Sequence, residues 1–153
     1  EVENLHLSGS DSGLTARGNG LANRLRGSSG GDTLAGDLGQ DTLTGGAGFD
    51  NFRFDTALGS TNVDTIADFD RTDDQIWLAL AVFTTLGGRQ THLPDAEFRL
   101  GSKALDANDH ILYDKATGSL WYDADGSGAG TALRFAYLEP GTALTASDVW
   151  AVL

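Results

Sequence analysis

Four oxygen-bearing side chains recur at intervals of nine residues: Asn23, Asp32, Asp41 and Asp50. Each follows a stretch rich in glycine. Ca²⁺ is a hard cation that takes about six to eight oxygen ligands, from carboxylates and backbone carbonyls. Glycine permits positive φ and lets two backbones approach a shared ion. Loops of this composition offer both kinds of oxygen to such a cation, although glycine and aspartate also form ordinary turns without any metal.

The interval of nine extends to the surrounding residues, without a gap from residue 18 to residue 53. A flexible glycine-rich linker has no such period, so we interpret this part of the chain as a repeat architecture. The apolar position of each repeat is expected to point inward. The shared residues are Gly18, Gly27, Gly36 and Gly45 at position one, Gly30, Gly39 and Gly48 at position four, and Leu25, Leu34, Leu43 and Phe52 at position eight.

The repeat resembles the RTX (repeats-in-toxin) nonapeptide G-G-x-G-x-D-x-U-x, strictly over residues 18–53 and loosely over 9–17. The resemblance implies a parallel β-roll, in which two consecutive nonapeptides make one turn. Each x-U-x is then a short strand, and each G-G-x-G-x-D a calcium loop. The resemblance also implies the C-terminal region of a type I secreted bacterial protein, similar to serralysin-type C-terminal domains.

Turns of two nonapeptides would pair loop 27–32 with loop 45–50, and loop 18–23 with loop 36–41. They would also stack Leu25 on Leu43 and Leu34 on Phe52. The resemblance then implies that Asp32 and Asp50 share one ion, and that Asn23 and Asp41 share another. The first repeat departs from the pattern, with Asn for Asp and Leu21 where Gly is expected, which weakens its site. The other loop residues that the resemblance assigns to metal binding are Gly27, Ser29, Gly30, Gly36, Leu38, Gly39, Gly45, Ala47 and Gly48.

The stretch from Phe52 to Phe69 is similar to the segment that closes the roll in serralysin-type proteases and their relatives. In that family, acids at this place bind calcium for the terminal loops. The match assigns this role to Asp55 and Asp64, and leaves Asp68 open. The alternative is that these acids are solvated strand ends.

Beyond the repeats, glycine becomes less frequent and the pattern is that of a conventional β-rich segment. We expect an all-β fold: a parallel β-roll over residues 1–53, followed by a β-rich C-terminal cap over 54–153. Runs rich in β-branched, aromatic and aliphatic residues, bounded by Gly, Asp and Pro, predict the strands. They are 2–7, 52–54, 74–80, 110–113, 119–122 and 132–138, with a helix at 79–86 and a helical turn at 145–148.

The segment Asp123 to Gly128 matches the start of an EF-hand loop, with acids at positions one and three and Gly at position six. Position twelve is Arg134, where a bidentate Glu is needed. We therefore interpret this segment as a hairpin turn rather than a metal site.

Five aromatic residues alternate with small or polar ones in the cap. A carbohydrate-stacking surface is one interpretation, but packing between strands is the commoner use and is what we expect. The five are Trp77, Trp121, Tyr122, Phe135 and Tyr137.

The composition excludes several classes of partner. Acidic residues number 22 and basic residues 10, for a net charge of −12. Nucleic-acid binding needs the opposite balance, so the surplus fits solvation or divalent cations. No apolar run approaches the roughly 20 residues of a spanning helix, so no membrane insertion is expected. Cysteine is absent, which excludes disulfides and thiolate metal sites.

The last six residues, 148–153, are an acid followed by five apolar residues. They resemble the uncleaved C-terminal signal of type I secretion substrates, which implies an ABC exporter as partner and an extracellular location. They could also form an edge strand that closes the cap. Because Glu1 starts the chain without a leader sequence, we expect a fragment of a longer protein.

Two functions remain after these exclusions. Neither H-E-x-x-H nor G-x-S-x-G occurs, so we expect no catalysis here, and any catalytic domain would lie upstream of Glu1. The first function is a calcium-binding module that folds outside the cell and carries the secretion signal. The second is a calcium-dependent adhesin or carbohydrate-binding module, which the terminal apolar segment favours less.

Overall fold

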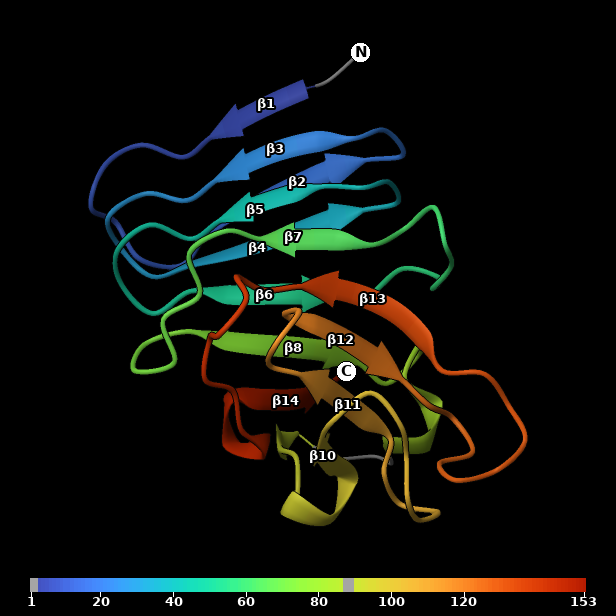
Figure 1. The fold of residues 1–153 in the computed structure, drawn as a ribbon. Coiled ribbons are helices and arrows are strands. Elements are labelled where there is room, and N and C mark those ends of the chain that lie inside the picture. Colours follow the sequence, from blue (N-terminus) through green and yellow to red (C-terminus); the bar gives the residue numbers. More distant parts are fainter. Residues whose placement is uncertain (1–2, 87–89) are drawn as a thin grey trace.

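The computed structural model describes residues 3–86 and 90–153 and is all-β (Figure 1). Within these residues the regular elements are strands and three single-turn 3₁₀ helices, η1 (Thr84–Leu86), η2 (Asp95–Glu97) and η3 (Ala146–Asp148). No helix in the described part of the chain is long and apolar enough to cross a membrane.

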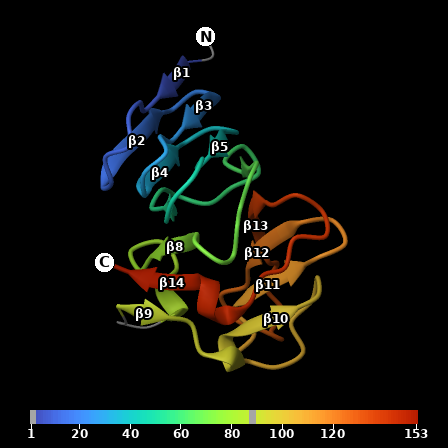
Figure 2. The ribbon, with the colours of Figure 1, turned by 90° about the vertical axis from the view of Figure 1, so that its left-hand side faces the viewer.

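The strands form two sheets that face each other across the core, as Figure 2 shows. Sheet A contains, in spatial order, β1 (Glu3–His6), β3 (Asn23–Arg26), β5 (Thr42–Thr44), β7 (Asp64–Ile66), β13 (Leu133–Tyr137), β12 (Ser119–Tyr122), β11 (Ile111–Asp114) and β10 (Phe98–Leu100). Sheet B contains β2 (Leu14–Asn19), β4 (Asp32–Asp37), β6 (Asn51–Phe54), β8 (Gln75–Ala79), β14 (Val149–Val152) and β9 (Thr91–His92).

The repeats wind as a parallel β-roll with the predicted register. Leu25 is in register with Leu43 on sheet A, and Leu34 with Phe52 on sheet B, so each turn contains two repeats. The four side chains are buried, which confirms the inward direction of the apolar position. A parallel β-roll over the repeats is therefore confirmed.

Both sheets continue past the last repeat, but with turns longer than two nonapeptides. Leu43 is in register with Ile66 on sheet A, and Phe52 with Ile76 on sheet B. The same core therefore runs from the repeats into the C-terminal part. The division at residues 53 and 54 stays a prediction from composition.

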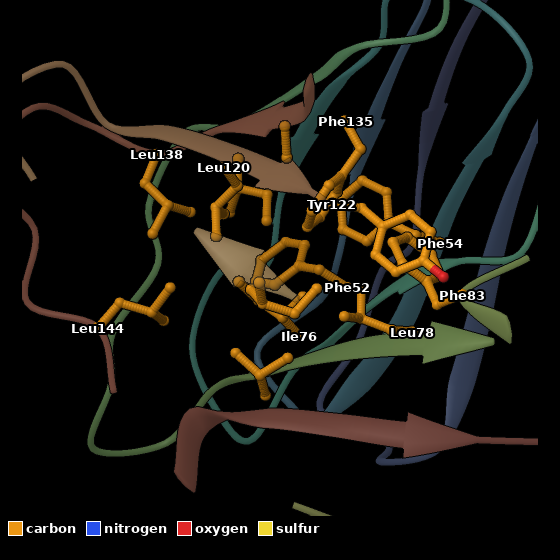
Figure 3. Packing of buried hydrophobic residues seen from close by; sticks show 14 of the residues in the cluster. Phe52, Phe54, Ile76, Leu78, Phe83, Leu120, Tyr122, Phe135, Leu138 and Leu144 are labelled. Atoms are coloured by element: carbon orange, nitrogen blue, oxygen red, sulfur yellow. The ribbon is translucent and has the colours of Figure 1, made fainter. Parts of the chain in front are cut away.

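Aromatic packing ties the two parts together (Figure 3). Phe54, the last residue of β6, which begins in the last repeat, contacts Phe135 edge-on with ring centroids 5.1 Å apart. Phe83 contacts both Phe135 and Tyr122 in the same manner, at 5.2 and 5.1 Å. Such pairs add about 0.5–1.5 kcal/mol beyond their burial, so the cap is a stable end for the roll.

The cap combines hairpins with two returning parallel strands. β11 pairs with β12, and β12 with β13, in antiparallel hairpins. β13 then pairs with β7, and β14 with β8, in parallel. Strands occur in all the segments that the sequence predicts as strands, within the described residues.

Two predictions about the cap are wrong. The helix expected at 79–86 is absent: Ala79 ends β8, and only η1 is helical. Val82, Thr84 and Thr85 are β-branched and disfavour a longer helix. The C-terminal strand β14 is not at an edge, because β8 and β9 flank it on both sides. The helical turn at 145–148 is confirmed, since Thr145 caps η3.

The expectation that all five cap aromatics lie in the core holds for Tyr122 and Phe135 only. Trp77, Trp121 and Tyr137 are half-buried. Strand alternation explains the difference, because Trp121 lies between two inward residues of β12 and so faces outward.

Candidate metal centre

The loops of the roll form two stacks, one at each side of the sheets. The first stack joins sheet B to sheet A and contains residues 20–22, 38–41 and 55–63. The second joins sheet A to sheet B and contains residues 7–13, 27–31, 45–50 and 67–74. Position six of each repeat therefore alternates between the stacks, as turns of two repeats require.

In the second stack, carboxylates of successive turns form a ladder. The backbone N–H of Asp32 donates to Oδ1 of Asp50, at 2.8 Å. The N–H of Asp50 donates in turn to Oδ1 of Asp74, at 3.0 Å. All three side chains are buried. Each acid thus lies against the next turn of the roll.

The first stack has a matching ladder. The N–H of Asn23 donates to Oδ1 of Asp41 at 2.7 Å, and the N–H of Asp41 to Oδ1 of Asp64 at 3.1 Å. The amide oxygen of Asn23 accepts the N–H of Asn19, within its own loop. The structure therefore brings together the pairs that the sequence predicts, Asn23 with Asp41 and Asp32 with Asp50.

One oxygen on each repeat aspartate remains buried and has no hydrogen-bond partner: Oδ1 of Asp32, Oδ2 of Asp41 and Oδ2 of Asp50. A buried carboxylate oxygen without a partner is costly. A cation in the loops would satisfy these oxygens. The buried oxygens of these loops therefore fit a bound hard cation.

Backbone carbonyls converge on the same places. A Cβ on Gly27 would collide with the carbonyl oxygen of Gly45 and would lie 3.1 Å from Oδ2 of Asp32. Gly39 and Gly48 adopt φ of 136° and 107°, which L side chains rarely reach. Glycine is thus required where carbonyl and carboxylate oxygens meet, and the donors are those that Ca²⁺ prefers.

Side chains alone do not make these sites. Within residues 3–86 and 90–153, no group of three or more His, Cys, Asp or Glu side chains is arranged to hold a metal. The loop carbonyls must therefore supply most of the ligands.

Comparison with known proteins agrees with this geometry. Residues 17–52 match the family model of the RTX calcium-binding nonapeptide repeat, in four copies. This part of the chain consists of RTX calcium-binding repeats. The match confirms the repeat type, the repeat number and Ca²⁺ as the ion.

A solved structure extends the similarity to the rest of the chain. The AlgE6R3 subunit of the Azotobacter vinelandii mannuronan C5-epimerase superposes with a TM-score of 0.53 and 26% sequence identity. The match covers 97% of this chain and 78% of that chain. Comparison with curated proteins finds no match. The RTX repeats and the cap thus share one β-roll architecture with that subunit.

Four carboxyl groups of the two ladders, those of Asp41, Asp50, Asp64 and Asp74, have raised pKa values. Burial raises the pKa of Asp41 and of Asp50 above the ordinary value, and the charge of Asp32 also raises that of Asp50. Burial and the charge of Asp41 raise the pKa of Asp64 to about 8. Burial raises the pKa of Asp74 to about 6, with the charges of Asp50 and Asp68 adding to it. Without a cation, Asp64 is therefore mostly protonated at neutral pH, and the other three acids ionise less readily than an ordinary aspartate.

Two acids after the repeats continue the ladders of the RTX loops, and only one of them, Asp64, was predicted from the sequence. Asp64 continues the first ladder, as the resemblance implies. Asp74 continues the second, but its distance along the chain from Asp50 breaks the period of nine. Asp68, left open by the sequence, accepts the N–H groups of Gly45 and Gly46 at 2.8 and 2.9 Å. The sequence signal that could have found Asp74 is an acid directly before a strand, because β8 begins at Gln75.

Asp55 lies outside both ladders. Its carboxylate accepts hydrogen bonds from Arg17 at 3.0 and 3.2 Å, and from Arg53 at 2.9 Å. Burial alone would raise the pKa of Asp55, but these two arginines lower it below the ordinary value. The carboxylate is already neutralised by arginine, so we place Asp55 in neither ladder, and its role as a calcium ligand stays a prediction from the resemblance.

The segment from Asp123 to Gly128 connects β12 to β13, as the hairpin interpretation predicts. The carboxylate of Asp125 accepts the N–H of Gly130 at 2.9 Å, which closes the loop on itself. Asp123 is buried beside it.

Proposed function

We propose that the chain is a calcium-binding RTX module that folds when it binds Ca²⁺ outside the cell, and that it belongs to a larger secreted bacterial protein. The observation that carries the proposal is the set of buried, unpartnered oxygens on Asp32, Asp41 and Asp50. They recur in register on successive turns, where loop carbonyls also gather.

The ions would be held across neighbouring turns. Neighbouring strands lie about 4.8 Å apart, and a calcium–oxygen distance is about 2.3–2.6 Å, so one ion can span two turns. We assign Asp32 with Asp50 to one ion, and Asp41 with Asn23 and Asp64 to the other ladder. We add Asp74 and omit Asp55. The loop residues assigned with them are Gly27, Ser29, Gly30, Gly36, Leu38, Gly39, Gly45, Ala47 and Gly48.

Folding and ion binding are then coupled. Each repeat buries one large apolar side chain, which is little to offset the entropy of ordering a whole nonapeptide. Bound calcium supplies the positive charge that buried carboxylates require. At a hundredfold excess over its Kd, an ion that binds only the folded form stabilises it by about 2.7 kcal/mol.

We further propose that residues 148–153 carry the signal for a type I ABC exporter. In the folded chain most of this segment is not available, because Val149 and Ala151 are fully buried in β14, and of its apolar residues only Leu153 is exposed. Asp148 accepts the N–H and the hydroxyl of Thr145 at 2.8 Å. An exporter could therefore bind the whole segment only before folding, which fits a module that folds in extracellular calcium. Any catalytic domain of the parent protein would lie upstream.

A calcium titration of the whole chain tests the proposal. Calorimetry should give saturable binding, and far-UV circular dichroism should show residues 9–53 disordered in chelator and ordered in calcium. A fully ordered roll in chelator would contradict coupled folding.

A further inference from the structure

Sheet A carries a hollow on its outer face, the face turned to the viewer in Figure 1. The hollow has a volume of about 470 Å³ and lies over β5, β7, β13 and β12. A second hollow of about 280 Å³ lies over β1, β3 and β5. Thr42 lines both, so the two hollows adjoin on the face of six strands, and together they are called the groove below. The groove residues used below are Arg24, Arg26, Thr42, Trp121, Arg134 and Tyr137.

The strand register sets the distance from Arg24 to Tyr137 along this groove. Arg24 is in register with Thr42, Thr42 with Thr65, and Thr65 with Tyr137. Three strand spacings separate the first from the last, about 14 Å. The groove is therefore long and shallow, which suits an extended polymer rather than a small molecule.

The groove is basic in a protein with a net charge of −12. Arg24, Arg26 and Arg134 are exposed, and none of them has an ion pair within the described residues. The arginines on the opposite sheet differ, because Arg17 and Arg53 are both bound to Asp55. Three guanidinium groups thus remain free on one face.

Acidic side chains are absent from the outward positions of the strands that form the groove, within the described residues. These positions are Asn4, His6, Arg24, Arg26, Thr42, Thr44, Thr65, Arg134, Tyr137, Ser119 and Trp121. The one acid that lines the groove is Asp41, whose side chain is buried in the first ladder. In the proposed function its charge is neutralised by calcium.

Aromatic rings form the end of the groove. The guanidinium of Arg134 lies 4.8 Å from the ring centre of Tyr137 and 5.9 Å from that of Trp121. Stacking on a ring orients the planar guanidinium while its N–H edge stays free for a carboxylate. Half-buried tryptophan and tyrosine also offer flat apolar surfaces beside polar groups.

We propose that this groove binds an acidic polysaccharide of the polyuronate class. The carboxylates of successive sugars pair with Arg24, Arg26 and Arg134, and one sugar ring packs on Trp121 or Tyr137. The threonine hydroxyls between them face sugar hydroxyls. Single-stranded nucleic acid is also a polyanion, so the 22 acidic residues of the chain repel it and a polyuronate alike. The threonine hydroxyls along the groove favour the sugar polymer, and the test below includes DNA.

This site differs from the calcium ladders, but it exists only on the folded roll. Binding is therefore measured in excess calcium, and circular dichroism of each variant shows separately whether the roll is folded. The failure of either proposal can then be recognised without the other.

The test is calorimetry of the full chain with polygalacturonate, beside dextran as a neutral polymer and a short single-stranded DNA. The whole chain should bind polygalacturonate and neither control, with an affinity that falls as salt rises. Combined Arg24→Ala, Arg26→Ala and Arg134→Ala should weaken binding by a factor of a hundred or more, at roughly tenfold per charge-assisted contact.

Two further variants separate the groove from net charge. Lys115→Ala removes one positive charge from the turn between β11 and β12, outside the groove, and should leave the affinity unchanged. Trp121→Ala should weaken binding at high salt as well as at low salt, since stacking is not screened. Equal binding by the triple variant, or binding of DNA or dextran in place of polygalacturonate, would overturn the proposal.

Discussion

Replacing Asp50 with asparagine separates the metal-binding role of the ladder from its hydrogen-bonding role. The amide oxygen can still accept the N–H of Asp32, as Oδ1 does at 2.8 Å. What is lost is the negative charge next to Oδ2, which is buried and has no partner. The effect on folding should therefore have opposite signs with and without calcium.

In excess calcium the variant should be less stable. If the ion is present at a hundredfold excess over its Kd, the loss is up to about 2.7 kcal/mol. Asp32→Asn should lose a similar amount, because both carboxylates are proposed to hold the same ion. The double variant should then lose about 2.7 kcal/mol again, rather than about twice that amount.

In chelator the sign should reverse. Burial and the charge of Asp32 raise the pKa of Asp50, so the ionised carboxylate disfavours the metal-free roll. An amide at this position removes that repulsion, and the strand signal in chelator should rise.

The assay is urea unfolding in calcium and the far-UV circular dichroism signal in chelator. Asp95→Asn is the matched control, because Asp95 is exposed and distant in sequence from both ladders. Additive losses for Asp32→Asn and Asp50→Asn would refute the shared ion. A lower strand signal for Asp50→Asn in chelator would show that the charge supports the fold by itself.

Three further outcomes are expected. In chelator, lowering the pH from about 8 to about 5 should increase the folded fraction, as measured by circular dichroism. The pKa values of Asp64 and Asp74, about 8 and 6, exceed the unfolded value of about 3.9. The folded form therefore binds more protons and loses stability as pH rises through this window. A folded fraction that rises with pH would contradict the ladder electrostatics. Asp41→Ala and Asp64→Ala should each lower calcium affinity, and the double variant should lower it less than additively in calorimetry; full additivity would place them at separate ions. Deleting residues 148–153, or extending the chain past Leu153, should stop export from a type I-competent host, measured as secreted against cytosolic protein, whereas undiminished export would reduce the segment to an ordinary strand.

The roll could be predicted from the sequence because each column of the repeat has one physical role. Glycine at the loops, aspartate at position six and an apolar residue at position eight mark each repeat, and the resemblance to RTX proteins implies the register of two repeats per turn. Asp74 was missed because the turn that contains it is longer than two repeats, and no period marks it.

Contacts that depend on distant partners could not be predicted. The sequence does not show that Arg17 reaches Asp55, far along the chain, so that acid was taken for a ligand. Register shifts between Leu120 and Trp121 where β12 meets β13, and no local signal marks this irregularity. The direction of Trp121 and Tyr137, and with it the groove, follows only from the assembled sheet.

The ladder hydrogen bonds all run in one direction along the roll, which indicates an order in which its turns fold. Each turn has a backbone amide that is satisfied only by a carboxylate of the following turn, from Asn23 to Asp41 to Asp64, and from Asp32 to Asp50 to Asp74. We therefore expect the cap to form first and order to grow from it toward the N-terminus, turn by turn. A fault at Asp64 or Asp74 removes the template for every turn before it, while a fault at Asn23 affects only the last turn to form.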